Sequence, residues 1–280
     1  MILFKQANRL SEYIDKEKKA GKRIGFVPTM GALHDGHLSL LSRSVAENET
    51  TVCSIFVNPT QFNNPDDFTH YPVTIEKDIS LLESAGTTIL FLPSVPEVYP
   101  EGFSKKVYPL GRLEEILEGA FRPGHFQGVC QVVDRLFEIT NPDHLYMGQK
   151  DYQQCMVVQK LLELTGRTEA IQLHIEPTQR ESSGLAMSSR NLRLSETQRE
   201  QASYIYSVLL QIKNELPAQP LEELEKRAVA QLTELGFQVD YLQIRNARTL
   251  EAPDSREEPL VVLVAATLGS IRLIDNLILN

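Results

Sequence analysis

Two histidines close to an apolar run near the N-terminus are the residues of this 280-residue chain best suited to chemistry. The run covers residues 24–28, and the loop after it contains two glycines, Gly31 and Gly36, which let the backbone turn tightly and approach a ligand. His34 and His37 stand three residues apart where a helix is expected to begin, so both imidazoles can face one way. A helix N-terminus adds free N–H groups and partial positive charge. The pattern therefore predicts a phosphate-binding loop.

A metal site is the other interpretation of this histidine pair, because histidine is a common metal ligand. The spacing lacks the i, i+4 geometry and the glutamate of H-E-x-x-H, and no cluster of cysteines supports it. The sequence contains no G-x-x-x-x-G-K-[ST] motif, and no G-x-G-x-x-G follows the first strand. A P-loop enzyme and a dinucleotide-binding protein are therefore both unsupported.

Composition narrows the class of protein further. The chain has 28 basic and 37 acidic side chains, a formal net charge of −9, which disfavours general nucleic-acid binding. The N-terminus carries charges where a signal peptide would be apolar, and the longest apolar stretch, residues 260–268, is too short to cross a membrane. The three cysteines are odd in number and far apart, which suits a reducing compartment. We expect a cytoplasmic protein without nucleic-acid or membrane partners.

The loop must be positioned by the elements around it. Short apolar runs predict strands that alternate with helices, and this order is typical of an α/β fold, a Rossmann-like parallel sheet with helices on both faces. We assign residues 1–177 to this first domain. The expected strands are residues 24–28, 51–57, 88–92, 144–147 and 171–175. One helix is expected to begin near residue 37, and three more are expected over residues 74–85, 126–137 and 151–165.

The pattern changes after residue 177. A capping box at Ser195 predicts a long helix that ends before Leu216, and a second helix is expected over 221–235. Two helices followed by strands favour a small α+β domain over residues 178–280. The expected strands of this domain are residues 239–244, 260–266 and 271–279.

Several motifs carry a family resemblance. The His-x-Gly-His pattern after the first strand resembles the signature of a nucleotidyltransferase superfamily that includes class I aminoacyl-tRNA synthetases. Members of that superfamily have a second phosphate-binding segment later in the chain, and residues 184–191, with their Met-Ser-Ser-Arg core, stand where it is expected. Residues 56–62, 122–128 and 146–154 narrow the match. In this order, the motifs resemble the pantoate–β-alanine ligase family.

This resemblance implies a two-step, ATP-dependent reaction. Pantoate would attack the α-phosphorus of ATP to form pantoyl adenylate and pyrophosphate, and β-alanine would then displace AMP to give pantothenate. The resemblance also implies ATP, pantoate and β-alanine as binding partners, Mg²⁺ accompanying ATP, a homodimer, and a C-terminal domain that acts as a lid.

The resemblance assigns roles to residues. The catalytic set is His34 and His37, which would stabilise charge on the phosphates, Lys150, which would neutralise the α-phosphate, and Arg190, which would close over the phosphates. The implied ATP-binding set is Met30, Gly31, Ala32, Leu33, His34, Asp35, Gly36, His37, Gly148, Gln149, Lys150, Asp151, Gln179, Met187, Ser188, Ser189 and Arg190.

The substrate and metal assignments come from the same resemblance. Two glutamines match the pantoate-binding positions, and neutral amides suit a hydroxy acid because each can donate to one oxygen and accept from a hydroxyl. The implied pantoate and β-alanine set is Gln61, Gln154, Asn58, Met30 and Arg122, and Asp78 is a candidate ligand for Mg²⁺.

Four positions depart from the family pattern. Val73 replaces a usual arginine, Gln179 replaces a usual valine, Ser183 stands where an aspartate is common, and Met147 stands where an aromatic residue is frequent. Two alternatives stay open: a nucleotidyltransferase of the same superfamily with another acceptor, and a nucleotide-binding regulatory protein with an inactive site. Intact Lys150 and the 188–190 segment argue against the second.

Overall fold

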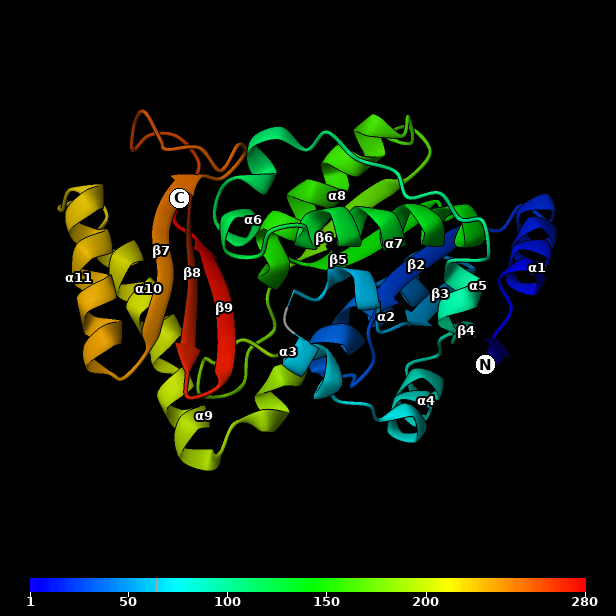
Figure 1. The fold of residues 1–280 in the computed structure, drawn as a ribbon, viewed down its shortest axis with the longest axis horizontal. Helices are drawn as coiled ribbons and strands as arrows, with labels where there is room; N and C mark the ends of the chain where they lie inside the picture. Colours follow the sequence, from blue (N-terminus) through cyan, green and yellow to red (C-terminus); the bar gives the residue numbers. More distant parts are fainter. Residues whose placement is uncertain (64) are drawn as a thin grey trace. The chain divides into compact units, whose positions relative to one another are not determined.

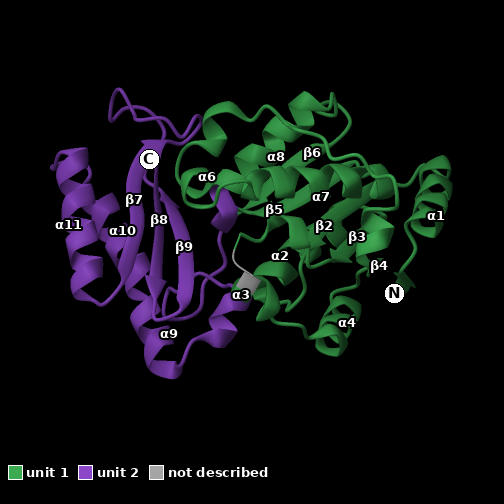
Figure 2. Cartoon of the chain, viewed as in Figure 1, with its two compact units in different colours: residues 1–148, 153–177 green, residues 149–152, 178–280 purple. Residues whose placement is uncertain are grey.

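The computed structural model describes residues 1–63 and 65–280, and the chain divides into two compact units (Figure 2). Unit 1 comprises residues 1–148 and 153–177, and unit 2 comprises residues 149–152 and 178–280. The short segment 149–152 thus separates from the first predicted domain. It groups with unit 2 because a side chain of the last strand holds its backbone, as described below.

Unit 1 is built on a six-stranded parallel sheet, so the predicted Rossmann-like architecture is confirmed (Figure 1). Its strand order is β1-β4-β3-β2-β5-β6. The bounds are β1 (Ile2–Phe4), β2 (Ile24–Thr29), β3 (Thr50–Ile55), β4 (Ile89–Phe91), β5 (His144–Gly148) and β6 (Gln172–Glu176). β1, a strand of only three residues, is not predicted from the sequence.

Helices pack on both faces of this sheet because successive strand residues point to opposite sides. Phe26 of β2 joins a cluster with α1 (Ala7–Lys19), α7 (His125–Thr140) and α8 (Tyr152–Leu164). Its neighbour Val27 joins a cluster with the other two long helices, α2 (Asp35–Glu47) and α4 (Ile75–Ser84). The remaining short helices of unit 1 are η1 (Pro59–Gln61), α3 (Pro65–Thr69), α5 (Val95–Val98), η2 (Gly111–Glu114) and α6 (Glu118–Phe121).

Unit 2 is the small α+β unit that the sequence predicts. Its sheet is antiparallel, in the order β7-β8-β9, and its helices pack apolar side chains against it. The bounds are η3 (Gln149–Asp151), η4 (Ser189–Arg193), α9 (Glu196–Ala202), α10 (Tyr204–Glu215), α11 (Leu221–Glu234), β7 (Gln238–Asn246), β8 (Leu260–Leu268) and β9 (Ile271–Ile278).

The single long helix predicted from Ser195 is wrong, because the chain forms two helices that meet at Ser203. The Ser203 hydroxyl and its N–H both hydrogen-bond to the carbonyl of Glu200, at 2.6 Å and 3.2 Å. A serine hydroxyl that competes for nearby backbone groups tightens a helical turn locally and interrupts the α-helical pattern. Within the described residues, no helix is long and apolar enough to cross a membrane.

The strand order places the histidine loop at a special point of the sheet. From β2 the chain moves to β3 on one side, and later returns to β5 on the other side. Ligands of doubly wound sheets bind at the carboxyl ends of strands where the order reverses in this way. The loop after β2 leaves the sheet at such a point.

Candidate active site

The loop between β2 and α2 has an unusual backbone. Gly31 and Ala32 both adopt positive φ angles, +83° and +50°. A side chain on Gly31 would also be crowded, because its Cβ would lie 3.0 Å from Ile55 Cγ2 and 3.1 Å from Asp78 Oδ2. Alanine incurs a penalty of about 1 kcal/mol in the left-handed region, so the surroundings must hold Ala32 there.

Asp78 is the residue that holds this loop. Its Oδ2 accepts the N–H of Ala32 at 2.9 Å, and its Oδ1 accepts the N–H of Leu33 at 2.8 Å. Thr74 Oγ1 donates to Oδ1 as well, at 3.0 Å, and Asp78 is fully buried in the first turns of α4. Asp78 in this arrangement does not fit the predicted role of a Mg²⁺ ligand. Its oxygens are used by backbone and hydroxyl donors, so its role is to shape the loop.

The two histidines meet at the start of α2. His34 is the N-cap residue, and His37 lies in the first turn. The His34 N–H donates to Nδ1 of His37 at 3.4 Å, and the two ring centroids are 4.0 Å apart. Because Nδ1 of His37 accepts this bond, the neutral ring carries its proton on Nε2. His37 can therefore present an N–H to a ligand at the helix N-terminus, where the helix dipole also favours an anion.

Three of the residues predicted to bind the acid substrate form a connected group in unit 1. Nε2 of Gln61 contacts Sδ of Met30 at 3.3 Å, and Nδ2 of Asn58 donates to Oε1 of Gln61 at 3.2 Å. Tyr99 donates its hydroxyl proton to Oδ1 of Asn58 at 2.9 Å. The structure thus brings Met30, Asn58 and Gln61 together, with amides, a thioether and a phenol in one cluster.

Helix α7 supports this cluster by packing against η1. A Cβ on Gly128 would lie 2.3 Å from the carbonyl oxygen of Thr60, so only glycine permits the close approach of the two elements. Nδ1 of His125 contacts the carbonyl oxygen of Gln61 at 2.7 Å. His125 is a buried support of Gln61 that the family motif contains but whose role the sequence did not resolve.

The two other predicted substrate residues have less direct support. Arg122 lies 3.5 Å from the carboxylate of Glu118, which is itself buried. Gln154 is half-buried in the first turn of α8. Its neighbour Gln153 is a buried glutamine, and it hydrogen-bonds to the backbone of Leu113, Ile116 and Glu118. The roles of Arg122 and Gln154 stay predictions.

In unit 2, the segment with Lys150 is fixed by Asn276 of β9. Nδ2 of Asn276 donates to the carbonyl oxygens of Gln149 and Lys150, both at 2.9 Å, and its Oδ1 accepts from Nε2 of Gln149 at 3.1 Å. Asn276 is 1% exposed, so water does not compete for these bonds. Gly148 ends β5 in unit 1, and Lys150 and Asp151 follow in η3. The backbone of Lys150 is therefore tied to the sheet of unit 2.

The later segment that is predicted to bind phosphate, residues 184–191, belongs to the same unit and has its own anchor. Gln179 accepts from the N–H of Met187 at 2.9 Å through its backbone oxygen, and Arg180 pairs with Ala186 in an isolated β-bridge. The Arg180 guanidinium binds both carboxylate oxygens of Asp275, at 2.6 Å and 3.0 Å, and lies 3.7 Å from the ring centroid of Tyr206.

The segment then enters η4. Ser188 caps this turn by accepting the N–H of Arg190 through its hydroxyl oxygen at 3.3 Å, and Ser189 is buried. The structure shows the surroundings of two residues that depart from the family pattern. Val73 is 70% exposed, and the Ser183 hydroxyl accepts from the N–H of Leu185 at 3.4 Å. A short polar side chain therefore serves this turn where an aspartate is common.

Asp275 and Asn276 hold the two segments that carry predicted site residues, and neither was predicted from the sequence. They are adjacent polar residues in the largely apolar run of β9, and both are buried. Buried polar side chains are usually hydrogen-bonded, so a polar pair inside an apolar strand was the available signal. One member orders the Lys150 segment and the other orders the Arg180 segment.

Asn276→Ala is expected to lower the rate of the ATP-dependent step by about 10-fold and to change the KM for the acid substrate little. The substitution leaves two carbonyl groups without their partner, which costs about 1–3 kcal/mol each and releases the backbone of Lys150. Steady-state kinetics would measure the change in rate, and thermal melting would measure the change in stability. Asn280→Ala, in the same C-terminal region, serves as a control because its side chain bonds to Arg256, Glu258 and Leu260 instead. Equal kcat values for wild type and Asn276→Ala would contradict the positioning role.

Known proteins resemble this chain over nearly its whole length. Residues 2–278 match the family described as pantoate-beta-alanine ligase. The pantothenate synthetase of Cytophaga hutchinsonii is 44% identical over 287 residues, covering 100% of this chain and 99% of that protein. The pantothenate synthetase of Alteromonas mediterranea is 42% identical over 280 residues, with 99% of each chain covered.

The chain belongs to the pantoate–β-alanine ligase family. The predicted family, and with it the class of ATP-dependent ligase, is confirmed.

Solved structures of this ligase family share the fold. The crystal structure of pantothenate synthetase from Thermus thermophilus is 40% identical with a TM-score of 0.92, and covers 100% of this chain and 99% of that one. The pantoate-beta-alanine ligase from Francisella tularensis, in complex with beta-gamma ATP and β-alanine, is 38% identical with a TM-score of 0.84. The alignment with it covers 99% of this chain and 97% of that one.

Proposed function

We propose that this protein condenses pantoate with β-alanine to form pantothenate, with consumption of ATP and through a pantoyl adenylate. The observation that carries the proposal is the family match over residues 2–278, in a chain that retains the locked His34–His37 loop. A carboxylate is a poor acyl donor, because its leaving group would be oxide. Converting it to a mixed anhydride with AMP supplies a good leaving group.

In the first step, a pantoate oxygen attacks the α-phosphorus of ATP, and the bond to the bridging oxygen of pyrophosphate breaks. Negative charge moves onto pyrophosphate as this bond breaks. The N–H that His37 presents from Nε2, together with the N-terminus of α2, suits an anion that gains charge. We assign Lys150 to the α-phosphate, and Ser188, Ser189 and Arg190 to the phosphates that leave.

In the second step, the neutral amine of β-alanine attacks the acyl carbon of the adenylate. The bond between this carbon and the phosphate oxygen of AMP breaks, and the nitrogen loses a proton. No side chain is required to form a covalent bond with the substrate in either step. The contribution of the protein is therefore positioning and charge stabilisation.

Mg²⁺ is the metal that the family implies, and it would arrive on the phosphate oxygens of ATP. Asp78 does not fit the predicted role of protein ligand, because it is fully buried and its oxygens accept from Ala32, Leu33 and Thr74. Magnesium commonly keeps several water ligands and binds through substrate phosphates. We assign no step of the reaction to a metal held by this chain.

Gln61→Ala is expected to raise the KM for pantoate at least about 10-fold while the KM for ATP changes less than about 3-fold. The amide contacts Met30 and Asn58, in the cluster that we assign to pantoate, and a lost hydrogen bond to a bound polar ligand costs about 1–2 kcal/mol. Initial rates with each substrate varied in turn measure the two constants. The reverse pattern, a selective rise in the KM for ATP, would refute this assignment.

The proposed reaction is tested by pantoate-dependent exchange of labelled pyrophosphate into ATP, without β-alanine. We expect exchange, because adenylate formation is reversible, and we expect AMP and pantothenate when β-alanine is added. Absence of exchange in folded protein supplied with Mg²⁺ would reject pantoate as the acceptor. We also propose a homodimer in the cytoplasm, where ATP and pantoate are available, and sedimentation of the purified protein tests the dimer.

A further inference from the structure

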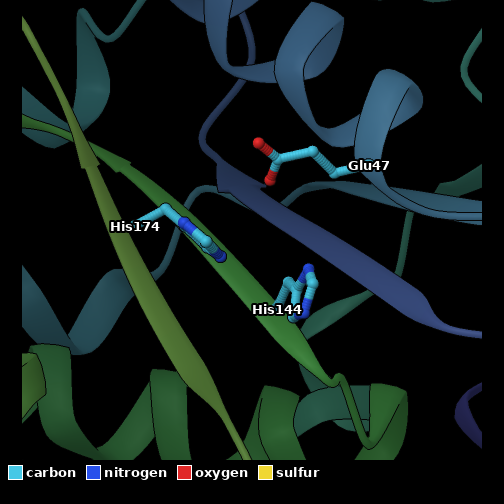
Figure 3. A group of neighbouring side chains, drawn as sticks. All are labelled: Glu47, His144 and His174. Carbon is cyan, nitrogen blue, oxygen red and sulfur yellow. The ribbon is translucent and has the colours of Figure 1, made fainter.

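A cluster of side chains of the types that bind metals lies in unit 1, on the face of the sheet that α2 covers. Glu47, His144 and His174 each offer one ligand atom, and these atoms all lie within 4.8 Å of one another (Figure 3). Glu47 is the last residue of α2, His144 is the first residue of β5, and His174 lies in β6. None of these residues belongs to the catalytic or substrate-binding sets described above.

Helix α2 separates this cluster from the loop that contains His34 and His37. His34 caps the N-terminus of α2, and Glu47 is its final residue. A 13-residue α-helix is about 18–20 Å long. The cluster therefore lies at the opposite end of α2 from the phosphate-binding loop, toward the amino ends of the strands.

The hydrogen bonds around Tyr146 leave His144 ready to bind a cation. The hydroxyl of Tyr146 donates its single proton to Glu47 Oε2 at 2.8 Å. Nδ1 of His144 contacts the same hydroxyl oxygen at 3.3 Å and must therefore be the donor there. The lone pair of a neutral His144 is then on Nε2. Metal-binding histidines commonly donate their other N–H in this way.

His174 supplies the second imidazole. Among the described residues, none hydrogen-bonds to its buried Nε2, and its ring stacks on Tyr146 with the centroids 4.7 Å apart. Nδ1 of His174 accepts from Arg43 at 3.0 Å, so the proton of the neutral ring lies on Nε2, where a buried N–H without an acceptor is unfavourable. Once that proton moves to Nδ1, the Nε2 lone pair can bind a cation.

The Arg43 side chain would compete with a cation for Glu47 and His174. Its guanidinium contacts Glu47 at 2.9 Å and Nδ1 of His174 at 3.0 Å, so it occupies both groups when no cation is bound. Arg43 also pairs with the carboxylate of Glu176. This second carboxylate can keep Arg43 when Glu47 and His174 turn to a cation, and His174 can then carry its proton on Nδ1.

We propose that Glu47, His144 and His174 form a binding site for a divalent transition metal, with Zn²⁺ as the fitting ion. Two imidazole nitrogens and one carboxylate oxygen are a ligand set typical of zinc, with water as the fourth ligand. Glu47 and Arg43 are 37% and 38% exposed, which leaves a path for the ion. The metal would join the end of α2 to β5 and β6, and so stabilise unit 1 without taking part in the ligation reaction.

The test is titration of the full-length, metal-free protein with Zn²⁺ against a chromophoric chelator, and with Co²⁺ by visible absorption. We expect one site and the intense d–d bands of four-coordinate Co²⁺. His144→Ala and His174→Ala should each weaken binding by at least ~100-fold, more than the ~10–100-fold typical of an outer-shell change. Tyr146→Phe should weaken it by ~10-fold, and Arg43→Gln should tighten it because the competing guanidinium is gone.

Matched controls separate this cluster from the other histidines. His70→Ala and the double variant His34→Ala/His37→Ala should bind Zn²⁺ as the wild type does, and Zn²⁺ should raise the melting temperature of both. Unchanged binding in His144→Ala or His174→Ala would refute the site. So would absence of binding in both the wild type and Arg43→Gln at roughly 100-fold molar excess of Zn²⁺. These readouts do not depend on the proposed reaction.

Discussion

Lys150→Ala is expected to slow formation of pantoyl adenylate by about 10²–10³-fold, with an unchanged fold. The α-phosphate gains a fifth oxygen neighbour in the transition state, and removing one preorganised electrostatic partner of such a site costs about 3–4 kcal/mol. The structure fixes the backbone of this residue, because Asn276 donates to the carbonyl oxygen of Lys150 at 2.9 Å from a buried position in β9. Single-turnover formation of the adenylate, together with pyrophosphate exchange, reads this step directly.

Two further variants separate charge from position. Lys150→Arg keeps the charge but replaces a compact ammonium by a planar guanidinium, so we expect it to recover only part of the lost rate. Lys160→Ala removes another lysine of the same stretch of chain, one that pairs on the surface with Glu163 at 2.9 Å, and should leave exchange unchanged. If Lys150→Ala retained more than about a third of the wild-type exchange rate, the residue would have no part in adenylate formation.

Asp78→Asn is expected to abolish most activity and to lower the free energy of unfolding by about 2–4 kcal/mol. The carboxylate accepts two backbone N–H groups, from Ala32 and Leu33, and an amide would turn a donor toward one of them. Charged hydrogen bonds of this kind contribute about 1.5–3 kcal/mol each. Ala32 would lose the contact that holds its φ at +50°, and the loop that presents His34 and His37 would lose its shape.

A graded series keeps this second prediction testable. Thr74→Ala removes only the hydroxyl that donates to Asp78 at 3.0 Å. We expect the free energy of unfolding to fall by about 1 kcal/mol and the KM for ATP to rise, in a protein that still folds. Glu76→Gln changes a carboxylate in the first turn of the same helix and should be silent. Denaturant unfolding and ATP kinetics measure both quantities. Wild-type kinetics in Thr74→Ala and Asp78→Asn together would show that the loop needs no anchor.

Much of the fold could be predicted from the sequence because strand and helix periodicities are local. The apolar runs at 24–28, 144–147 and 260–266 each became a strand within two residues of the expected bounds. The break at Ser203 and the three-residue strand β1 could not be predicted. The break depends on a single hydroxyl group. Strand β1 depends on pairing with β4, in which Ile2 lies opposite Ile89, 87 positions away in the chain.

The motifs also indicated the family. The order and spacing of their histidines, glutamines and serines are typical of one family, and with it of one type of reaction. What only the tertiary structure decided is how those groups are held. Asp78 looked like a metal ligand, yet folding buries it against the N–H groups of residues 32 and 33. Asn276 stands 126 residues after Lys150 and still fixes its backbone. Such roles depend on long-range hydrogen bonds, which no local pattern of residue types encodes.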